Sequence, residues 1–319
     1  MINLIKTMLI VNVTPDSFSD GNDYFKYSDF SSRLTNIINT TNAVDINTVD
    51  IIDIGAHSTA PFNKNISYEE ELKRFENSLI EFVKFHQGWI RPNIAISIDT
   101  YRPKIFKSVY ERVKEICCNQ NQNPKIKFIW NDISGIIDDE VIDLLSRKEN
   151  EDVSYVLSYN VSSQTGDREI GVGHMQFAKD MSKDELLYDI VDFFNKGIEF
   201  FSKRIVDFNR SNIFKRVIFD PCFGFAKTRA ENQILLANDN LKQVISSFPP
   251  EISWLIAISR KSFLREKSEL GSRDPAVIEK IEKIHLDYLY KWMREMPQNH
   301  LIFRVHDLNV AQSVINEHK

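Results

Sequence analysis

Short, continuous apolar runs recur along the whole chain, and they constrain its fold more than any other feature. The eight runs are 8–13, 51–54, 94–98, 126–130, 153–157, 217–219, 254–258 and 301–305. Unbroken apolarity, rather than alternation with polar residues, is typical of strands that are covered on both faces, as in a parallel sheet. The sequence therefore predicts a parallel sheet of eight strands.

Amphipathic, charged segments separate these runs and predict helices. They are 69–86, 103–116, 183–203, 230–247 and 275–294. Ser67 precedes the first segment as a candidate N-cap, and Pro103 and Pro275 suit the first turn of a helix. Strands that alternate with helices favour an α/β fold, a (β/α)8 TIM barrel, over a doubly wound sheet. We expect residues 1–319 to form one such domain.

Composition and charge exclude several classes of protein. The 319 residues are 42% hydrophobic and 27% charged, which is typical of a globular chain rather than a disordered one. A net charge of -5 offers no basic footprint for nucleic acid, and no apolar run approaches the roughly 20 residues of a membrane span. The three cysteines lack metal-site spacing, and no signal peptide is visible, so we expect a cytoplasmic protein.

Polar residues follow each apolar run at the point where a strand would end. They are Asn12, Asp53, Asp99, Asn131, Asp132, Ser158, Tyr159, Asn160, Asp220, Ser259, Arg260, Lys261, Ser262, Arg304, His306 and Asp307. Asp and Asn could simply cap the helices that follow, but Lys, Arg and His are poor N-caps. Barrel active sites are built at the carboxyl ends of the strands. The pattern therefore predicts a functional site at this rim.

Six short motifs come one per strand end in a fixed order. They read Asn-Val-Thr-Pro-Asp-Ser-Phe-Ser-Asp-Gly at 12–21, Ile-Asp-Thr at 98–100, Asn-Asp-Ile-Ser-Gly at 131–135, Asp-Pro-Cys-Phe-Gly-Phe at 220–225, Ser-Arg-Lys-Ser at 259–262 and Arg-Val-His-Asp at 304–307. In identity and order they resemble the motifs of the dihydropteroate synthase family over nearly the whole chain. That family has a (β/α)8 barrel fold, which agrees with the strand count.

The resemblance implies an enzyme, a transferase that joins 6-hydroxymethyl-7,8-dihydropterin pyrophosphate to 4-aminobenzoate with loss of pyrophosphate. In this family pattern Asp220 binds the exocyclic amine and a ring nitrogen of the pterin, and Asn131 binds the ring edge. Lys261 binds the ring oxygen or nitrogen, and Phe225 forms an aromatic wall. Asp99 lies near the reacting edge and stabilises developing positive charge.

The same resemblance implies an anion site and a metal. Arg304 and His306 alternate along one strand, so their side chains can point the same way and bind the pyrophosphate. Together with Asp99 and Lys261 they are the implied catalytic residues. Asn12 resembles the family residue that coordinates Mg²⁺, whose other ligands are phosphate oxygens and water.

The second substrate has a weaker signature. By resemblance, Phe18 lies in a loop that closes over the aminobenzoate ring, and Thr59 lies in the next loop that contacts substrate. Ser262 is expected to bond the carboxylate. Phe18 and Phe225 could instead be ordinary core residues.

Two loops depart from the family pattern. After the second strand the family usually reads Asp-x-Gly-Gly-Glu-Ser-Thr-Arg-Pro, where this chain has Ala56, His57 and Ala60 in place of Gly, Glu and Arg. After the fifth strand the usual Met-His-Met-Gln-Gly is replaced by the run 158–162, while a His-Met-Gln string stands at 174–176. Loss of a guanidinium from a pyrophosphate site could cost a few kcal/mol of transition-state binding.

Three interpretations therefore stay open. The chain is a divergent but working dihydropteroate synthase, a paralogue that binds pterin with weak or no synthase activity, or a barrel that transfers methyl groups from a reduced folate. The retained Asn12, Arg304 and His306 argue against the methyltransferase, which has no pyrophosphate to bind. Small-molecule substrates are expected as partners, with no nucleic acid and no membrane, and the resemblance also implies a homodimer.

Overall fold

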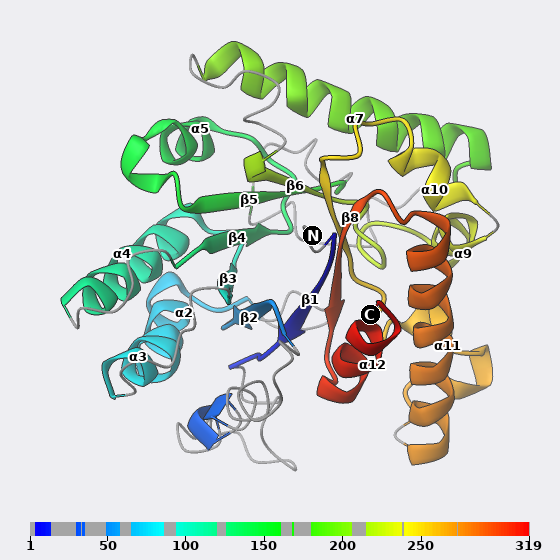
Figure 1. Cartoon of the computed structure of the whole chain (residues 1–319), viewed down its shortest axis with the longest axis horizontal. Helices are drawn as coiled ribbons and strands as arrows, with labels where there is room; N and C mark the ends of the chain where they lie inside the picture. Colours follow the sequence, from blue (N-terminus) through cyan, green and yellow to red (C-terminus); the bar gives the residue numbers. More distant parts are fainter. Residues whose placement is uncertain are drawn as a thin grey trace.

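Eight parallel strands close into a barrel in which each strand pairs with its neighbours in chain order and β8 returns to β1 (Figure 1). The strands are β1 Ile5–Ile10, β2 Ile51–Gly55, β3 Ala95–Asp99, β4 Phe128–Asp132, β5 Val153–Ser158, β6 Val217–Asp220, β7 Ser253–Ile256 and β8 His300–Val305. The computed structural model describes residues 4–13, 30–32, 34–35, 49–57, 65–85, 94–119, 126–160, 168, 180–205, 215–237, 239–272 and 274–318. The predicted (β/α)8 barrel is confirmed.

Helices surround the barrel, with α2 to α4 at the left of Figure 1, α7 at the top, and α11 and α12 at the right. They are α2 Tyr68–Phe75, α3 Glu81–Phe85, α4 Pro103–Asn119, α5 Asp139–Ser146, α7 Lys183–Arg204, α9 Arg229–Leu236, α10 Asn240–Ile245, α11 Pro275–Glu295 and α12 Leu308–His318. A π-helical turn, η2 Glu76–Ile80, joins α2 to α3, and short 3-10 turns stand at η3 Lys148–Asn150, η6 Ser262–Leu264 and η7 Lys267–Glu269. Within the described ranges, no helix combines the length and apolarity that a membrane span requires.

Two apolar layers form because successive strand residues point to opposite faces. Inside the barrel a small cluster fills the lower part, made of Met8, Ile51, Ile129, Val156, Ile218, Leu255 and Ile302. The residues between them face outward into the larger cluster beneath the helices, where Trp130 and Trp254 are fully buried. Phe194 of α7 stacks on Phe219 of β6 with ring centroids 4.3 Å apart. The continuous apolar runs are thus strands buried on both faces.

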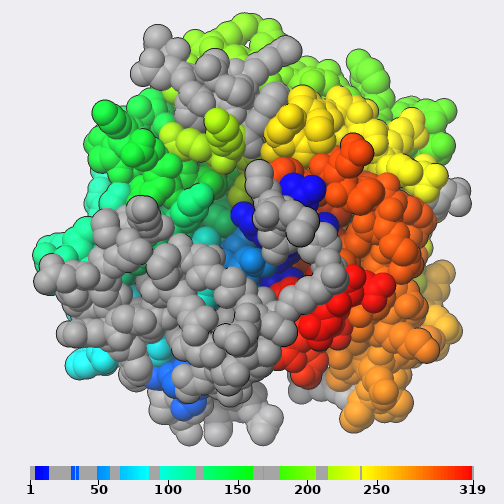
Figure 2. Space-filling model, in the orientation of Figure 1, coloured from blue at the N-terminus to red at the C-terminus, as the bar shows by residue number. Residues whose placement is uncertain are grey.

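The chain ends meet at the seam that closes the barrel. Ile5 to Leu9 of β1 pair in register with Leu301 to Val305 of β8. In the space-filling view the blue first strand lies beside the red C-terminal segment (Figure 2). The helix α12 then packs back on β1 and α11. Residues from the two ends of the sequence therefore share one rim.

Several predicted boundaries differ from the structure, and the first strand and the segment 230–247 are two examples. The first strand ends at Ile10 rather than residue 13, although Val11 and Val13 still donate to the carbonyls of Asp53 and Gly55, so the chain stays beside β2. The segment 230–247 is two helices, α9 and α10, because the backbone becomes extended at Ala237. Helical periodicity continues across the break, so the sequence alone does not reveal it.

The predicted helix starts are confirmed. Ser67 accepts a hydrogen bond from the amide of Glu70 at 3.2 Å as the N-cap of α2. Pro275 is the first residue of α11, with Asp274 as its N-cap. Each cap satisfies an amide that the helix itself cannot, which fixes where the loop leaves the rim.

Gly135, in the turn after β4, is predicted to tolerate no side chain. Its φ is +68°, and a Cβ there would fall well inside the contact distance of the Ser158 carbonyl oxygen. We expect Gly135→Ala to lower the free energy of unfolding by about 3 kcal/mol or more, from overpacking added to left-handed strain. Gly271, with φ +76° and nothing within 4 Å, is the matched control.

For Gly271→Ala only the backbone strain remains, and the expected loss is about 1 kcal/mol. Urea unfolding of both variants measures the difference. Equal losses in the two variants would contradict the close approach of the loops after β4 and β5.

Candidate active site

A polar layer lies directly above the apolar plug inside the barrel. Each of four strands carries a polar residue two positions after an inward-facing apolar one, so both point into the barrel. The pairs are Ile51 and Asp53, Ala95 and Ser97, Ile129 and Asn131, and Ile302 and Arg304. Asp53 is fully buried at their centre. Its Oδ1 accepts from Ser97 Oγ at 2.5 Å and from Asn131 Nδ2 at 3.1 Å. Four strands are therefore tied together by one carboxylate and its partners.

Arg304 joins two carboxylates at this level. Its Nε and Nη2 donate to Asp53 Oδ2 at 2.8 and 2.6 Å, and Nη2 also donates to Asp99 Oδ2 at 2.5 Å. Burial lowers the pKa of Arg304, but Asp53 and Asp99 together raise it above its ordinary value, so the guanidinium stays charged. Burial raises the pKa of Asp99, and Arg304 opposes that effect. The predicted catalytic residues Asp99 and Arg304 are in direct contact.

Because Gly55 has no side chain, oxygen atoms of Asn12 and Asp99 can approach its Cα closely. A Cβ at Gly55 would lie 3.2 Å from Asn12 Oδ1 and 3.4 Å from Asp99 Oδ2. Amide and carboxylate oxygens are the ligands that Mg²⁺ prefers, with water and substrate phosphates completing its shell. Among the described residues no group of three or more His, Cys, Asp or Glu forms a metal cage. The donors at Gly55 thus fit a magnesium ion that depends on phosphate for its remaining ligands.

Asp220, Lys261 and Phe225 form a second group at the ends of β6 and β7. Asp220 is buried, and its Oδ1 accepts from the Cys222 amide at 2.7 Å. Burial raises the pKa of Asp220, against the lowering effects of that hydrogen bond and the nearby lysines. Lys261 Nζ lies 4.5 Å from the centre of the Phe225 ring. Burial and the Arg304 charge lower the pKa of Lys261 to about 8.

Strained backbone carries this second group. Cys222, Ala226 and Arg260 have φ values of 60°, 45° and 58°, in the left-handed region that favours glycine. All three lie in the loops after β6 and β7, beside Asp220 and Lys261. Such strain persists only where the surroundings hold it, and it concentrates at functional sites.

His306 is held by Ser259 at the end of β8. Ser259 Oγ is 3.0 Å from His306 Nδ1 and also accepts from the His306 amide at 3.2 Å. Burial, with Arg304, Arg260 and Lys261 nearby, lowers the pKa of His306 well below its usual value. The ring is therefore neutral at pH 7, with Nδ1 engaged and Nε2 free of any hydrogen bond given by the described residues.

The remaining predicted residues are less engaged. Ser262 is exposed and begins the three-residue turn η6. Asn131 is only 5% exposed, and its amide nitrogen is directed to Asp53. Phe18 and Thr59 lie outside the described residues, as do Ala60 and the string 174–176.

The divergent residues after β5 brace neighbouring loops. Ser158 Oγ donates to the carbonyl of Asp132 at 2.8 Å, and Asn160 Nδ2 donates to that of Ile133 at 2.8 Å. Tyr159 OH donates to Asp189 of α7 at 2.5 Å. The altered motif therefore supplies hydrogen bonds that join the loops after β4 and β5.

The rim residues that received no role from the sequence include Asp53, Ser259 and Lys227. Lys227 is buried, donates to the carbonyls of Cys222 at 2.9 Å and Tyr159 at 3.3 Å, and so braces the loop that carries Asp220. The sequence did contain a sign of Asp53's position. Asp53 is a carboxylate inside an apolar run, and it lies two residues before Gly55, so the two residues share the inward-facing side of β2.

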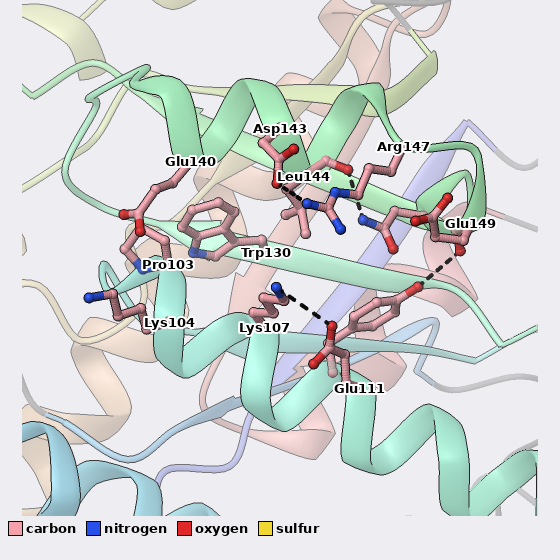
Figure 3. Close-up of a pocket in the computed structure, with 12 residues that line it drawn as sticks. Pro103, Lys104, Lys107, Glu111, Trp130, Glu140, Asp143, Leu144, Arg147 and Glu149 are labelled. Atoms are coloured by element: carbon pink, nitrogen blue, oxygen red, sulfur yellow. Dashed lines mark hydrogen bonds and ion pairs between the residues drawn. The ribbon is translucent and has the colours of Figure 1, made fainter.

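A cavity of about 150 Å³ lies on the flank of the barrel, between α4 and α5 (Figure 3). Lys107 and Glu111 of α4 face Asp143 and Arg147 of α5 across it, and Trp130 lies between the two helices. Trp130 points outward from β4, whereas the next residue, Asn131, points into the barrel. This cavity therefore lies on the other side of the sheet from the polar layer and contains none of the predicted site residues.

Acid is predicted to destabilise the fold through His285 of α11. His285 is 1% exposed, and its Nε2 has no hydrogen-bond partner among the described residues. Burial lowers its pKa from 6.5 to about 4. As the pH falls, His285 therefore takes up a proton in the unfolded chain before it does so in the folded one. The contribution of neutral His285 to the free energy of unfolding is complete above pH 6.5 and is lost between pH 6.5 and 4.

The full loss through this residue is about 3 kcal/mol, from about 1.4 kcal/mol per pKa unit. The free energy of unfolding of His285→Leu, measured across pH 4 to 7, is expected to fall less steeply than that of the original chain. Parallel curves would show that His285 is not the group responsible.

The chain resembles known proteins over most of its length. The family model of pterin binding enzymes matches residues 8–286. The dihydropteroate synthase of Staphylococcus haemolyticus is 29% identical over 98% of this chain and 97% of its own length, and the Escherichia coli type-3 dihydropteroate synthase is 28% identical over 80% of this chain and 79% of its own.

Solved structures share the fold at lower identity. A dihydropteroate synthase from Anaplasma phagocytophilum with bound 6-hydroxymethylpterin-monophosphate has a TM-score of 0.67 and 19% identity, covering 98% of both chains. The Xanthomonas albilineans dihydropteroate synthase with 4-aminobenzoic acid has a TM-score of 0.62 and 21% identity, covering 98% of this chain and 90% of the other. The resemblance seen in the strand-end motifs is confirmed, and this chain belongs to the pterin binding enzyme family.

Proposed function

We propose that this chain is a dihydropteroate synthase, which condenses 6-hydroxymethyl-7,8-dihydropterin pyrophosphate with 4-aminobenzoate to give dihydropteroate and pyrophosphate. The observation that carries the proposal is the meeting of Asn12 and Asp99 at Gly55, with Arg304 bonded to Asp99 and the buried Asp220 and half-buried Lys261 on the neighbouring strand ends. Relatives with this name match the chain nearly end to end, and two solved relatives hold a pterin phosphate and 4-aminobenzoic acid.

The pterin edge is assigned to the group at β6 and β7. An aminopyrimidinone presents N–H donors that a carboxylate accepts, and Asp220 is a buried carboxylate at the rim. Lys261 supplies a cation for the ring oxygen or nitrogen, and Phe225 offers an aromatic face beside it. Asn131 contributes its amide to the ring edge.

The anion site is assigned to β8. Arg304 Nη1 makes no hydrogen bond to the described residues, and it supplies donors to the pyrophosphate while Nε and Nη2 remain on the carboxylates. His306 is neutral, and with Nδ1 on Ser259 its Nε2 can donate a hydrogen bond to a phosphate oxygen. Asn12 would hold Mg²⁺ together with phosphate oxygens and water, and the ion would neutralise charge on the leaving group when it is bound.

In the reaction, the carbon–oxygen bond of the pterin methylene breaks and its electron pair leaves with pyrophosphate. The amine of 4-aminobenzoate then forms the new carbon–nitrogen bond and loses a proton. Asp99 faces the positive charge that develops on the pterin methylene. Ser262, Phe18 and Thr59 are assigned to the aminobenzoate side.

The setting of the enzyme forms part of the proposal. We expect residues 1–319 to act as one pterin-binding barrel domain in the cytoplasm, where the free thiols Cys117, Cys118 and Cys222 would stay reduced. Small-molecule substrates are the expected partners, without nucleic acid or membrane. A homodimer is also expected, and sedimentation of the purified chain would test it.

Pyrophosphate release is the direct test of the function. Purified protein is given the dihydropterin pyrophosphate and magnesium, with and without 4-aminobenzoate. We expect release that depends on aminobenzoate, together with formation of dihydropteroate. Tight pterin binding without release, or release that ignores aminobenzoate, would instead support the pterin-binding paralogue with a damaged second-substrate site.

Asp220→Asn and Arg304→Lys are predicted to separate the two halves of the site. Asp220→Asn removes the charge that the pterin N–H groups bind, so pterin affinity should fall roughly 30-fold or more. Arg304→Lys keeps one cation between the carboxylates but loses the planar fork. It should leave free pterin binding within about 3-fold while turnover falls roughly 30-fold.

Calorimetric binding of the free pterin and the turnover assay measure both effects. Thermal unfolding serves as the control that each variant is folded. Normal pterin affinity in Asp220→Asn would refute its assignment. Equal losses of free pterin affinity and of turnover in Arg304→Lys would refute the anion role.

A further inference from the structure

Asp53 is buried at the centre of the site, yet the proposed reaction gives it nothing to do. Its side chain is 0% exposed. Both oxygens are already used, Oδ1 by Ser97 and Asn131 and Oδ2 by Arg304. A carboxylate in that position has no free lone pair directed to substrate, so any effect on the reaction must pass through its partners.

Two of those partners are residues assigned to substrate. Arg304 comes from β8 and Asn131 from β4, so the Asp53 carboxylate on β2 links the anion side of the rim to the pterin side. Resting on the proposed function, we propose that Asp53 is the positioning residue that orients both the Arg304 guanidinium and the Asn131 amide toward the substrate.

The geometry of arginine makes this orientation specific. A guanidinium is a rigid plane with five donors, so fixing its Nε and Nη2 on one oxygen also fixes the direction of Nη1. Nη2 reaches Asp99 at the same time, and Nη1 is left without a protein partner among the described residues. Asp53 therefore determines which edge of Arg304 an anion meets.

The same carboxylate selects the orientation of Asn131. Because Asp53 Oδ1 can only accept, it takes the Nδ2 end of the amide at 3.1 Å. The amide oxygen of Asn131 is thereby directed away from Asp53 and remains an acceptor for the substrate. Ser97, the third partner, donates from β3 at 2.5 Å and holds Asp53 itself in place.

Asp53→Asn tests the proposal with the least change in shape. The new amide has one oxygen and one NH2 group. Its oxygen can accept either from Arg304 or from Ser97 and Asn131, and the NH2 group would face the other donors without a bond. Asp50→Asn is the matched control, because Asp50 stands just before β2 at the opposite end of the barrel and accepts from the Thr7 amide at 2.8 Å. Thermal unfolding of both variants checks that they are folded.

We expect Asp53→Asn to lower kcat for dihydropteroate formation roughly 10- to 100-fold, the range typical of losing a group that orients a ligand-binding side chain. Asp50→Asn should retain turnover within about 2-fold. A double mutant, Asp53→Asn with Arg304→Lys, should lose much less than the product of the two single losses, because both changes disable the same guanidinium and only the share that passes through Asn131 is added. Multiplied losses, or normal kcat in Asp53→Asn, would overturn the proposal.

A readout on the free protein keeps this test separate from the proposed function. Hydrogen exchange of the Arg304 Nε–H, assigned by its loss in Arg304→Lys, should be slow in the original chain and in Asp50→Asn and at least about 10-fold faster in Asp53→Asn. If the original chain makes no dihydropteroate, the function fails while this exchange still decides the role of Asp53. Unchanged exchange in Asp53→Asn would overturn that role.

Discussion

The ion pair between Asp53 and Arg304 is the interaction on which the rest of the rim depends. A carboxylate inside a barrel loses its hydration, and an unpaired one would cost several kcal/mol. Here Arg304 contributes two donors at 2.8 and 2.6 Å, and Ser97 and Asn131 satisfy the other oxygen. Because those donors come from three other strands, the relative positions of β2, β3, β4 and β8 at the rim are set by the coordination of one side chain.

Because side chains alternate along each strand, the polar residues of the site face into the barrel while their neighbours pack outward beneath the helices. On β4, Trp130 faces outward beneath the helices while Asn131 faces inward to Asp53. Below the polar residues, the apolar cluster around Met8 and Ile302 closes the barrel from its other end. Burial in this layer, and then the nearby charge of Arg304, lower the pKa of Lys261 to about 8.

Much of the fold and part of the site followed from the sequence alone. Eight apolar runs predicted eight strands, since continuous apolarity has one common cause, burial on both faces. Asp99 and Arg304 were identified at strand ends, and the structure brings them within 2.5 Å. The break at Ala237 was not predictable, because the helical period continues through it.

Asp53 received no role from the sequence for a related reason. Its importance lies in partners on three other strands, and no local pattern shows which side chains will surround it. The exposure of Ser262 and the hydrogen bonds of Ser158 and Asn160 depend likewise on loops that meet only after folding. Local signals predict which elements form, whereas tertiary contacts decide what each polar residue binds.

The seam between β1 and β8 places a demand on the order of events during biosynthesis. Asp53 and Arg304 are 251 positions apart in the chain. A ribosome that has produced β1 to β7 has made the acidic half of the rim, but the cation that compensates it is still missing. Sheet closure and charge compensation therefore arrive together with the last strand. Until then the edges of β1 and β7 have no partner strand, and unpaired strand edges are sites at which chains aggregate.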